Sequence, residues 1–155
     1  MTIYFDEDVR PDDETESLMQ AAAVAALSGE GIDPENASIS VSFVDAAEIR
    51  KLNSQYRGID KKTDVLSFPA FESGEIPKEE DLEEGEELAL GDVVICEEVC
   101  EAQAKEFGHS IQREIIYLFT HSVFHLLGYD HENEDDKADM RAREEEVMKL
   151  LELER

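Results

Sequence analysis

The run from Ser38 to Val44 is the strongest constraint on the fold of this chain. Within it, Ile39, Val41 and Phe43 alternate with serines. A period of two residues is that of a β-strand with one buried face, whereas a helix would repeat every three to four residues. The segment therefore predicts a strand that belongs to a sheet packed on one side.

Other segments alternate between the two kinds of pattern. Short β-prone runs predict strands over 2–5, 65–68 and 88–95. Helical spacing and capping residues predict helices over 14–27, 46–56, 97–107, 111–127 and 134–151. Strands that alternate with helices indicate an α/β (α+β) fold. We expect a small mixed sheet of about four strands packed with about five helices, with a metal site at the end of a central helix.

The length of 155 residues suits one domain over 1–155. Residues 72–87 are acidic, contain glycine and proline and lack an apolar period, so we expect a surface loop there. The N-terminus does not resemble a signal peptide, and the longest apolar run, 21–27, is too short to span a bilayer. We expect a cytoplasmic protein with no membrane partner, in which Cys96 and Cys100 are reduced and buried.

Three of the four histidines form the pattern H-x3-H-x5-H at His121, His125 and His131. On a helix, His121 and His125 are one turn apart on the same face. Gly128 can end this helix and return the chain so that His131 approaches the pair. Three imidazoles with a fourth position open to water are typical of catalytic zinc. The alternatives are buried core histidines, or a structural ion closed by Cys96 or Cys100.

The formal net charge of −26 argues at first against a nucleic-acid partner, since phosphate binding depends on basic surface. The acidic runs are typical of a solvated surface. Between residues 50 and 64, however, the sign reverses. Five cations stand against Asp60 and Asp64 there: Arg50, Lys51, Arg57, Lys61 and Lys62. A local basic patch remains.

Several stretches together resemble the YbeY endoribonucleases, a family of ribosomal RNA maturation factors. They are Leu52-Asn53, Tyr56-Arg57, Thr63 to Pro69, Leu90 to Ile95, His121 to His131, and Met140 with Glu144. The resemblance implies a metal-dependent endoribonuclease that cleaves single-stranded RNA and acts in small-subunit ribosomal RNA maturation and ribosome quality control. Its partners would be ribosomal RNA and the small ribosomal subunit, not DNA. The chain departs from the family at Ser122, where glycine is usual, and at Lys62, where proline is frequent.

The residue types themselves indicate how such a site would work. One divalent ion held by neutral His121, His125 and His131 would lower the pKa of bound water and polarise a phosphoryl oxygen. We expect zinc, although three imidazoles also suit nickel, copper or iron. Arg57 is the candidate to offset charge on the phosphate, because its planar fork holds two oxygens. The resemblance points to the same residue; the alternative is a salt bridge to Asp60 or Asp64.

Two further function classes are compatible with a histidine site. The first is a metallohydrolase of another substrate, above all a peptidase. Zinc peptidases with a His-Glu-x-x-His helix carry their base directly after the first histidine, where this chain has Ser122. The second is a non-catalytic ribosome-binding factor with a structural metal.

A metal-bound histidine usually donates a hydrogen bond from its other ring nitrogen to a carboxylate or a carbonyl. The available carboxylates are Asp92, Asp130 and Glu132. Asp130 is also placed to stabilise the turn, and His109 is predicted to stand at a helix entry.

Overall fold

The computed structural model describes residues 1–6, 8–130 and 132–153. Its sheet has four strands in the order β1-β2-β4-β3. β1 (Thr2–Phe5) and β4 (Leu88–Cys96) both run parallel to β2 (Ala37–Val44), whereas β3 (Val65–Pro69) is antiparallel to β4. The predicted mixed sheet is confirmed, and so is the alternating order of strands and helices.

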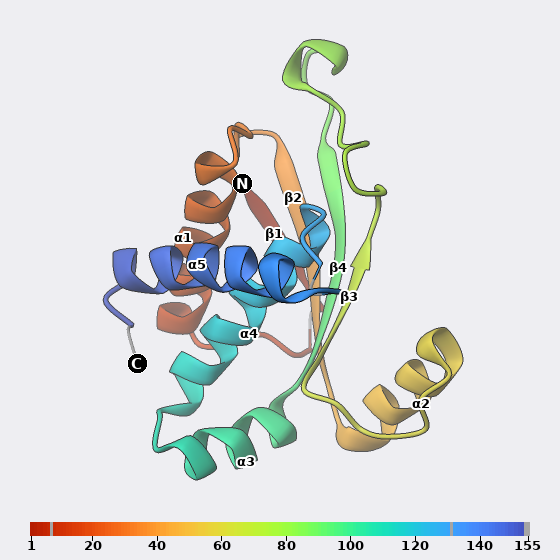
Figure 1. Ribbon diagram of the computed structural model, residues 1–155, viewed down its shortest axis with the longest axis vertical. Coiled ribbons are helices and arrows are strands. Elements are labelled where there is room, and N and C mark those ends of the chain that lie inside the picture. The colour runs from red at the N-terminus through yellow and green to blue at the C-terminus, as the bar shows by residue number, and fades with distance from the viewer. Residues whose placement is uncertain (7, 131, 154–155) are drawn as a thin grey trace.

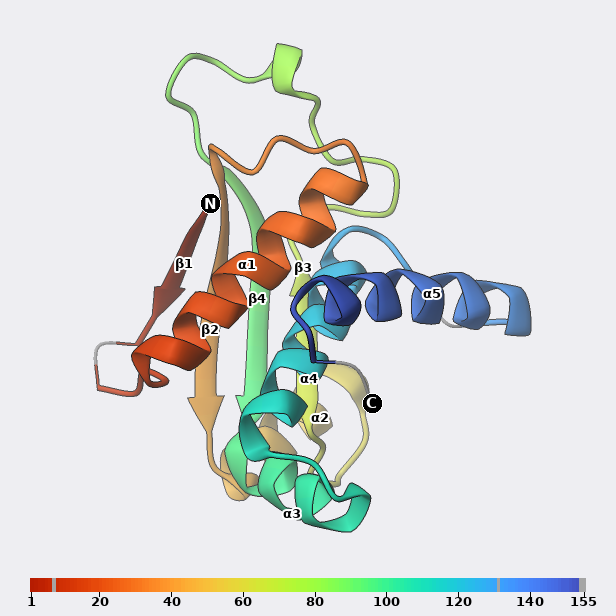
Figure 2. The same ribbon diagram turned by 90° about the vertical axis from the view of Figure 1, so that its left-hand side faces the viewer.

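Five helices accompany the sheet in the described residues: α1 (Asp13–Gly29), α2 (Ala46–Arg57), α3 (Glu97–Phe107), α4 (Ile111–Leu126) and α5 (Glu134–Leu150). Figures 1 and 2 show α1, α4 and α5 on one face of the sheet and α2 on the other. α4 contacts α1, α3, α5, β3 and β4, so it is the central helix. No described helix is long and apolar enough to cross a membrane.

The alternation in β2 has the predicted consequence. Ile39, Val41 and Phe43 are buried in the main core between the sheet and the helices α1, α4 and α5. On the opposite face, a smaller cluster around Ile49 and Leu66 fills the space beneath α2. The sheet therefore holds α4 on one side and α2 on the other, and residues from both helices reach the same cleft.

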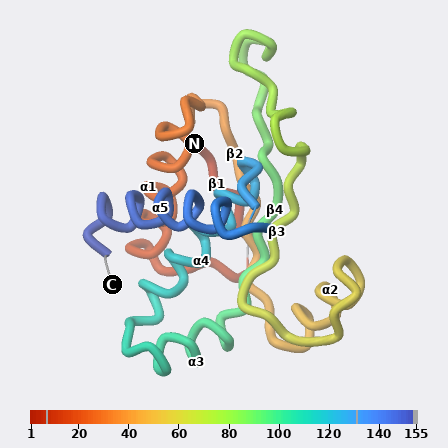
Figure 3. The backbone as a smooth tube through the Cα atoms, in the orientation of Figure 1, coloured from red at the N-terminus to blue at the C-terminus, as the bar shows by residue number. Residues whose placement is uncertain are grey.

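The segment between β3 and β4 contains the acidic run 72–87. It projects beyond the end of the sheet, as the green part of the tube in Figure 3 shows. Most of its side chains are exposed, which agrees with a surface loop. Within this loop, Glu79–Asp81 form a short 3-10 helix, η1, which was not predicted from the sequence.

The end of α4 is shaped by Gly128. This residue has φ +100°, a conformation that favours glycine, and a Cβ at this position would lie 2.9 Å from the Ser73 hydroxyl. The helix ends at Leu126, close to the predicted stop. The chain can therefore turn sharply at Gly128 while the segment after β3 packs against the turn.

Candidate metal centre and active-site cleft

A cleft of about 940 Å³ opens between α4 and the segment formed by β3 and the residues that follow it. One wall consists of residues 63–73, and the last turn of α2 contributes Tyr56 and Arg57. The opposite wall comes from α4, with His121 and His125, and from residues 128–130. The cleft thus brings together the histidine helix and the basic loop, which are far apart in the sequence.

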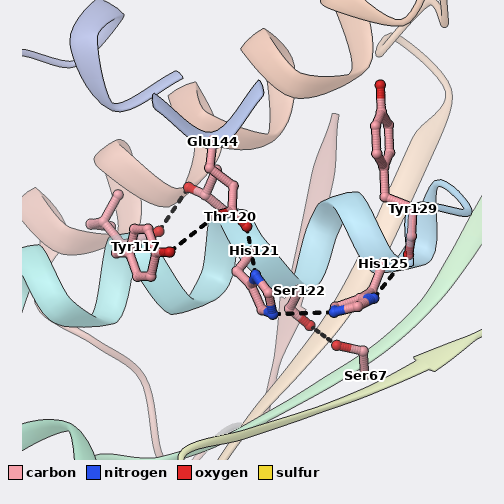
Figure 4. Close-up of polar contacts among 9 residues, drawn as sticks. Ser67, Tyr117, Thr120, His121, Ser122, His125, Tyr129 and Glu144 are labelled. Atoms are coloured by element: carbon pink, nitrogen blue, oxygen red, sulfur yellow. Dashed lines mark hydrogen bonds and ion pairs between the residues drawn. The ribbon is translucent and has the colours of Figure 1, made fainter. Parts of the chain in front are cut away.

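The imidazoles of His121 and His125 point toward one another, as Figure 4 shows. Their Nε2 atoms are 3.1 Å apart. The other ring nitrogens are each held by an acceptor. His121 Nδ1 lies 2.5 Å from Oε2 of Glu144 on α5, and His125 Nδ1 lies 2.9 Å from the backbone carbonyl of Tyr129. The arrangement fixes both rings.

These acceptors also determine where the ring protons lie. A carbonyl oxygen accepts hydrogen bonds only, so a neutral His125 carries its proton on Nδ1 and a lone pair on Nε2. The carboxylate of Glu144 has the same effect on His121. Two lone pairs therefore face each other across 3.1 Å, an arrangement that a cation between them would stabilise. In a tetrahedral zinc site, two nitrogens at about 2.0–2.1 Å from the ion are about 3.3 Å apart. The pair fits a metal ion.

The third predicted ligand, His131, lies outside the described residues. Within the part of the chain that the structure describes, no group of three metal-binding side chains forms. Two of the three predicted ligands are therefore described, His121 and His125, and both line the cleft from α4. The participation of His131 stays a prediction from its spacing.

Both histidines line the cleft, which is not the position of histidines packed inside a core. Cys96 and Cys100 are fully buried free thiols and do not line it, so neither is placed beside the imidazole pair. Burial, together with the nearby carboxylates of Asp64 and Glu114, raises the pKa of the Cys100 thiol to about 12. The prediction of reduced, buried cysteines is confirmed.

The two described histidines have partners other than the candidate carboxylates. His121 uses Glu144 and His125 a backbone carbonyl, in place of Asp92, Asp130 or Glu132. Glu144 is only 3% exposed, and its Oε1 also accepts a hydrogen bond from the Tyr117 hydroxyl at 3.0 Å. The sequence does carry a signal for it, because Glu144 falls in the otherwise apolar stripe of α5 between Met140 and Val147. A buried acid in such a stripe needs a partner.

Ser122, the departure from the family pattern beside the first histidine, is fully buried. Its hydroxyl lies 2.5 Å from the Ser67 hydroxyl on β3. The hydroxyl thus links α4 to the sheet instead of bonding the preceding turn of its own helix. A buried serine engaged in this way supplies no general base at the position where a zinc peptidase carries its glutamate.

Arg57 is the last residue of α2 and is exposed at the cleft. The alternative of a salt bridge to Asp60 or Asp64 is not observed. Asp60 pairs with Arg50 at 2.8 Å, and Asp64 accepts hydrogen bonds from the Val65 amide and the Gln103 side chain. Among the described cleft residues, Arg57 is the only arginine or lysine. It therefore remains available to an anion.

An α/β fold with a cleft that joins an imidazole pair, a buried carboxylate behind it and an arginine is the architecture of an enzyme. The sequence itself matches the family described as Endoribonuclease YbeY over residues 3–152. The chain belongs to this endoribonuclease family, whose members are hydrolases that act on RNA.

Individual relatives agree with this assignment. The chain is 46% identical to Endoribonuclease YbeY of Clostridium botulinum (strain Loch Maree), with 99% of each chain covered. It is 52% identical to Endoribonuclease YbeY of Caldanaerobacter subterraneus, over 90% of this chain and 89% of the relative. Among solved structures, the solution structure of TM1509 from Thermotoga maritima has a TM-score of 0.60 at 26% identity, covering 97% of this chain and 92% of that one.

Proposed function

We propose that this protein is a metal-dependent endoribonuclease that cleaves single-stranded RNA. The observation that carries the proposal is the pair of Nε2 atoms 3.1 Å apart, each on a ring whose other nitrogen is already held, in the same cleft as Arg57. Membership of the endoribonuclease family supports RNA cleavage as the reaction. The imidazole pair and Arg57 support a metal-dependent mechanism. The alternative function as a peptidase is not supported, because Ser122 stands where a zinc peptidase carries its glutamate base, and its hydroxyl contacts Ser67.

His121 and His125 would hold the ion, and the sequence spacing adds His131 as the third ligand. Zinc suits this set because imidazole is one of its common ligands and three protein ligands leave a position open. Such an ion supplies Lewis acidity, which activates water and polarises a phosphoryl oxygen. Glu144 and the Tyr129 carbonyl hold the ring protons on Nδ1, which would leave both Nε2 lone pairs free to bind an ion.

Arg57 would act on the substrate. Its guanidinium can donate two parallel hydrogen bonds to phosphate oxygens and offset the negative charge that develops there during cleavage. Its place at the end of α2, across the cleft from α4, separates the phosphate contact from the imidazole pair. The phosphodiester would lie between the two.

For the biological setting, we propose maturation of small-subunit ribosomal RNA and ribosome quality control in the cytoplasm, with ribosomal RNA and the small subunit as partners. The family resemblance supports this setting. The exposed cations Lys51, Lys61 and Lys62, which lie within six residues of Arg57 in the sequence, would offer further contacts to an RNA backbone.

The test combines metal analysis with RNA cleavage. The purified protein should contain about one divalent ion per chain and cut a single-stranded RNA, and chelation should stop cleavage until metal is returned. His125→Ala should lose both ion and cleavage, whereas His109→Ala, at the one histidine outside the predicted set, should keep both. Cleavage that persists in folded, metal-free His125→Ala protein would overturn the proposal.

Arg57→Ala separates the substrate contact from the metal site. This variant should keep its ion but cleave on the order of 100-fold more slowly, the typical cost of removing one donor to a developing anion. Arg141→Ala, at an exposed arginine on α5 outside the cleft, is the matched control and should cleave normally. An unchanged rate in Arg57→Ala would remove Arg57 from the reaction.

A further inference from the structure

Tyr56 is an aromatic side chain that the fold does not use for its core. It is 61% exposed and lines the histidine cleft next to Arg57. Two other aromatic residues, Tyr4 and Phe107, are about half exposed, and neither lines this cleft. The position of Tyr56 in the cleft, next to an arginine suited to phosphate, leaves the ring accessible to a bound ligand.

The ring is nevertheless held in place. Tyr56 packs against Phe68 of β3 in a T-shaped contact with ring centroids 5.2 Å apart and an interplanar angle of 72°. Phe68 is itself half-buried and belongs to the cluster beneath α2. The Tyr56 hydroxyl has no hydrogen-bond partner among the described residues, so the ring is braced through its apolar part alone. The residue nevertheless remains largely exposed where it lines the cleft.

The chemistry of the neighbouring positions indicates the ligand. Arg57 suits a phosphate, and a nucleotide presents a phosphate together with a flat aromatic base. Stacking of a base on an aromatic side chain strengthens binding by about 5- to 150-fold per base. The contact needs an unpaired base, because the bases of a duplex are already stacked within the helix.

We propose that Tyr56 is the base-stacking residue of the cleft, and that its ring receives the nucleobase of a nucleotide adjacent to the phosphate held by Arg57. This inference deepens the proposed function, on which it rests, because it assigns the preference for single strands to one side chain. Tyr56 acts in binding and positioning of RNA, whereas the reaction itself stays with the histidines and Arg57.

The chain contains no tryptophan, so Tyr56→Trp creates a unique fluorescent reporter. In chelated protein, where the RNA stays intact, a single-stranded oligoribonucleotide should quench this tryptophan. The same strand annealed to its complement, and a strand of the same length without bases, should quench it far less. Phe107→Trp places a comparably exposed reporter on α3, outside the cleft, and should not be quenched. Equal quenching by single strand and duplex would overturn the proposal.

Steady-state kinetics provide a second test of the stacking role of Tyr56. Tyr56→Ala should raise KM for single-stranded RNA about tenfold or more while kcat changes by less than about threefold. Tyr56→Phe should restore the wild-type KM, since the stack needs the ring and not the hydroxyl. An unchanged KM in folded Tyr56→Ala, with normal cleavage by the wild type, refutes the stacking role and leaves the proposed function standing. Quenching of Tyr56→Trp by single strands, in a protein that never cleaves RNA, supports the stacking role and refutes the proposed function.

Discussion

Glu144 shows how much of the candidate centre depends on single residues behind the cleft wall. Its carboxylate is buried, and it accepts from His121 Nδ1 and from the Tyr117 hydroxyl. A carboxylate in this position orients the ring and increases the basicity of the metal-facing nitrogen. On the proposed function, Glu144 would therefore affect metal affinity without touching the ion.

We predict that Glu144→Gln weakens zinc binding by about 10- to 100-fold, the usual cost of removing such a partner. The amide has nearly the same shape but no charge, so the fold should persist. Competition with a chromophoric chelator measures the affinity. Glu145→Gln, at the exposed neighbour on α5, is the matched control. Equal affinities in the two variants would show that Glu144 has only a packing role.

The Cys100 thiol gives a prediction with a pH dependence. Its pKa is raised from 9.0 to about 12, chiefly by burial and then by the charge of Asp64. The neutral thiol is favoured in the folded state, so its contribution to stability is complete below pH 9 and is lost as the pH rises from 9 toward 12. At pH 8 a disulfide reagent should react with Cys100 only after denaturant is added. Rapid labelling of both cysteines in the folded protein would contradict this burial.

At the scale of elements, α4 illustrates why local signals were sufficient for most of the fold. Ser110 caps this helix by accepting a hydrogen bond from the Arg113 amide at 3.1 Å, and Gly128 follows its end. Both signals lie within a few residues of the helix that they delimit, so a sequence reveals them. The alternation in β2 is equally local.

What the sequence could not supply is contact between distant elements. Glu144 meets His121 from another helix 23 residues away, and Ser67 meets Ser122 across 55 positions. Separations of 23 and 55 residues do not follow the periodicity of a helix or a strand, so the sequence pattern does not indicate these contacts. They arise only because α5 and β3 pack against α4. The short η1 helix was missed for a different reason, because Glu79–Asp81 lie in an acidic run without an apolar face.

Removal of the α4 cap tests whether the helix start affects the metal centre. Ser110→Ala should lower the free energy of unfolding by about 1 kcal/mol, since the Arg113 amide loses its acceptor. Zinc affinity should stay within about twofold, because both histidines lie in the second half of α4, eleven or more residues from the cap. Urea denaturation and chelator competition measure the two quantities. A large loss of affinity would mean that the helix start positions the imidazoles.

At the scale of the whole molecule, the core does not include the candidate centre. The main cluster is formed by the sheet with α1, α4 and α5, and the imidazoles lie at its border on the cleft. We predict that the metal-free protein stays folded, with its far-ultraviolet circular dichroism unchanged. Metal at 100 times its dissociation constant should add about 2.7 kcal/mol to the free energy of unfolding and raise the Tm. Melting of the fold on chelation would favour a structural ion instead.

The net charge of the protein affects its binding to RNA through long-range repulsion. The chain carries a formal charge of −26, while Arg57 is the only arginine or lysine among the described residues that line the cleft. Repulsion between the acidic surface and RNA acts over about 10 Å at 0.1 M salt and further in dilute buffer, whereas the contact at Arg57 is short-ranged. Added salt therefore screens the repulsion before it weakens the contact.

The salt dependence of binding should reflect this balance. For single strands, the logarithm of affinity falls with the logarithm of salt concentration by about 0.7 per phosphate neutralised, so contacts to Arg57 and its neighbouring lysines give a slope no steeper than about −3. Below about 0.05 M salt, the association rate should rise as salt is added, because repulsion slows the encounter. Fluorescence anisotropy and stopped-flow mixing with chelated protein measure both quantities. A slope of about −5 or steeper would require a broad basic surface, and Arg57→Ala should reduce the slope by about 0.7.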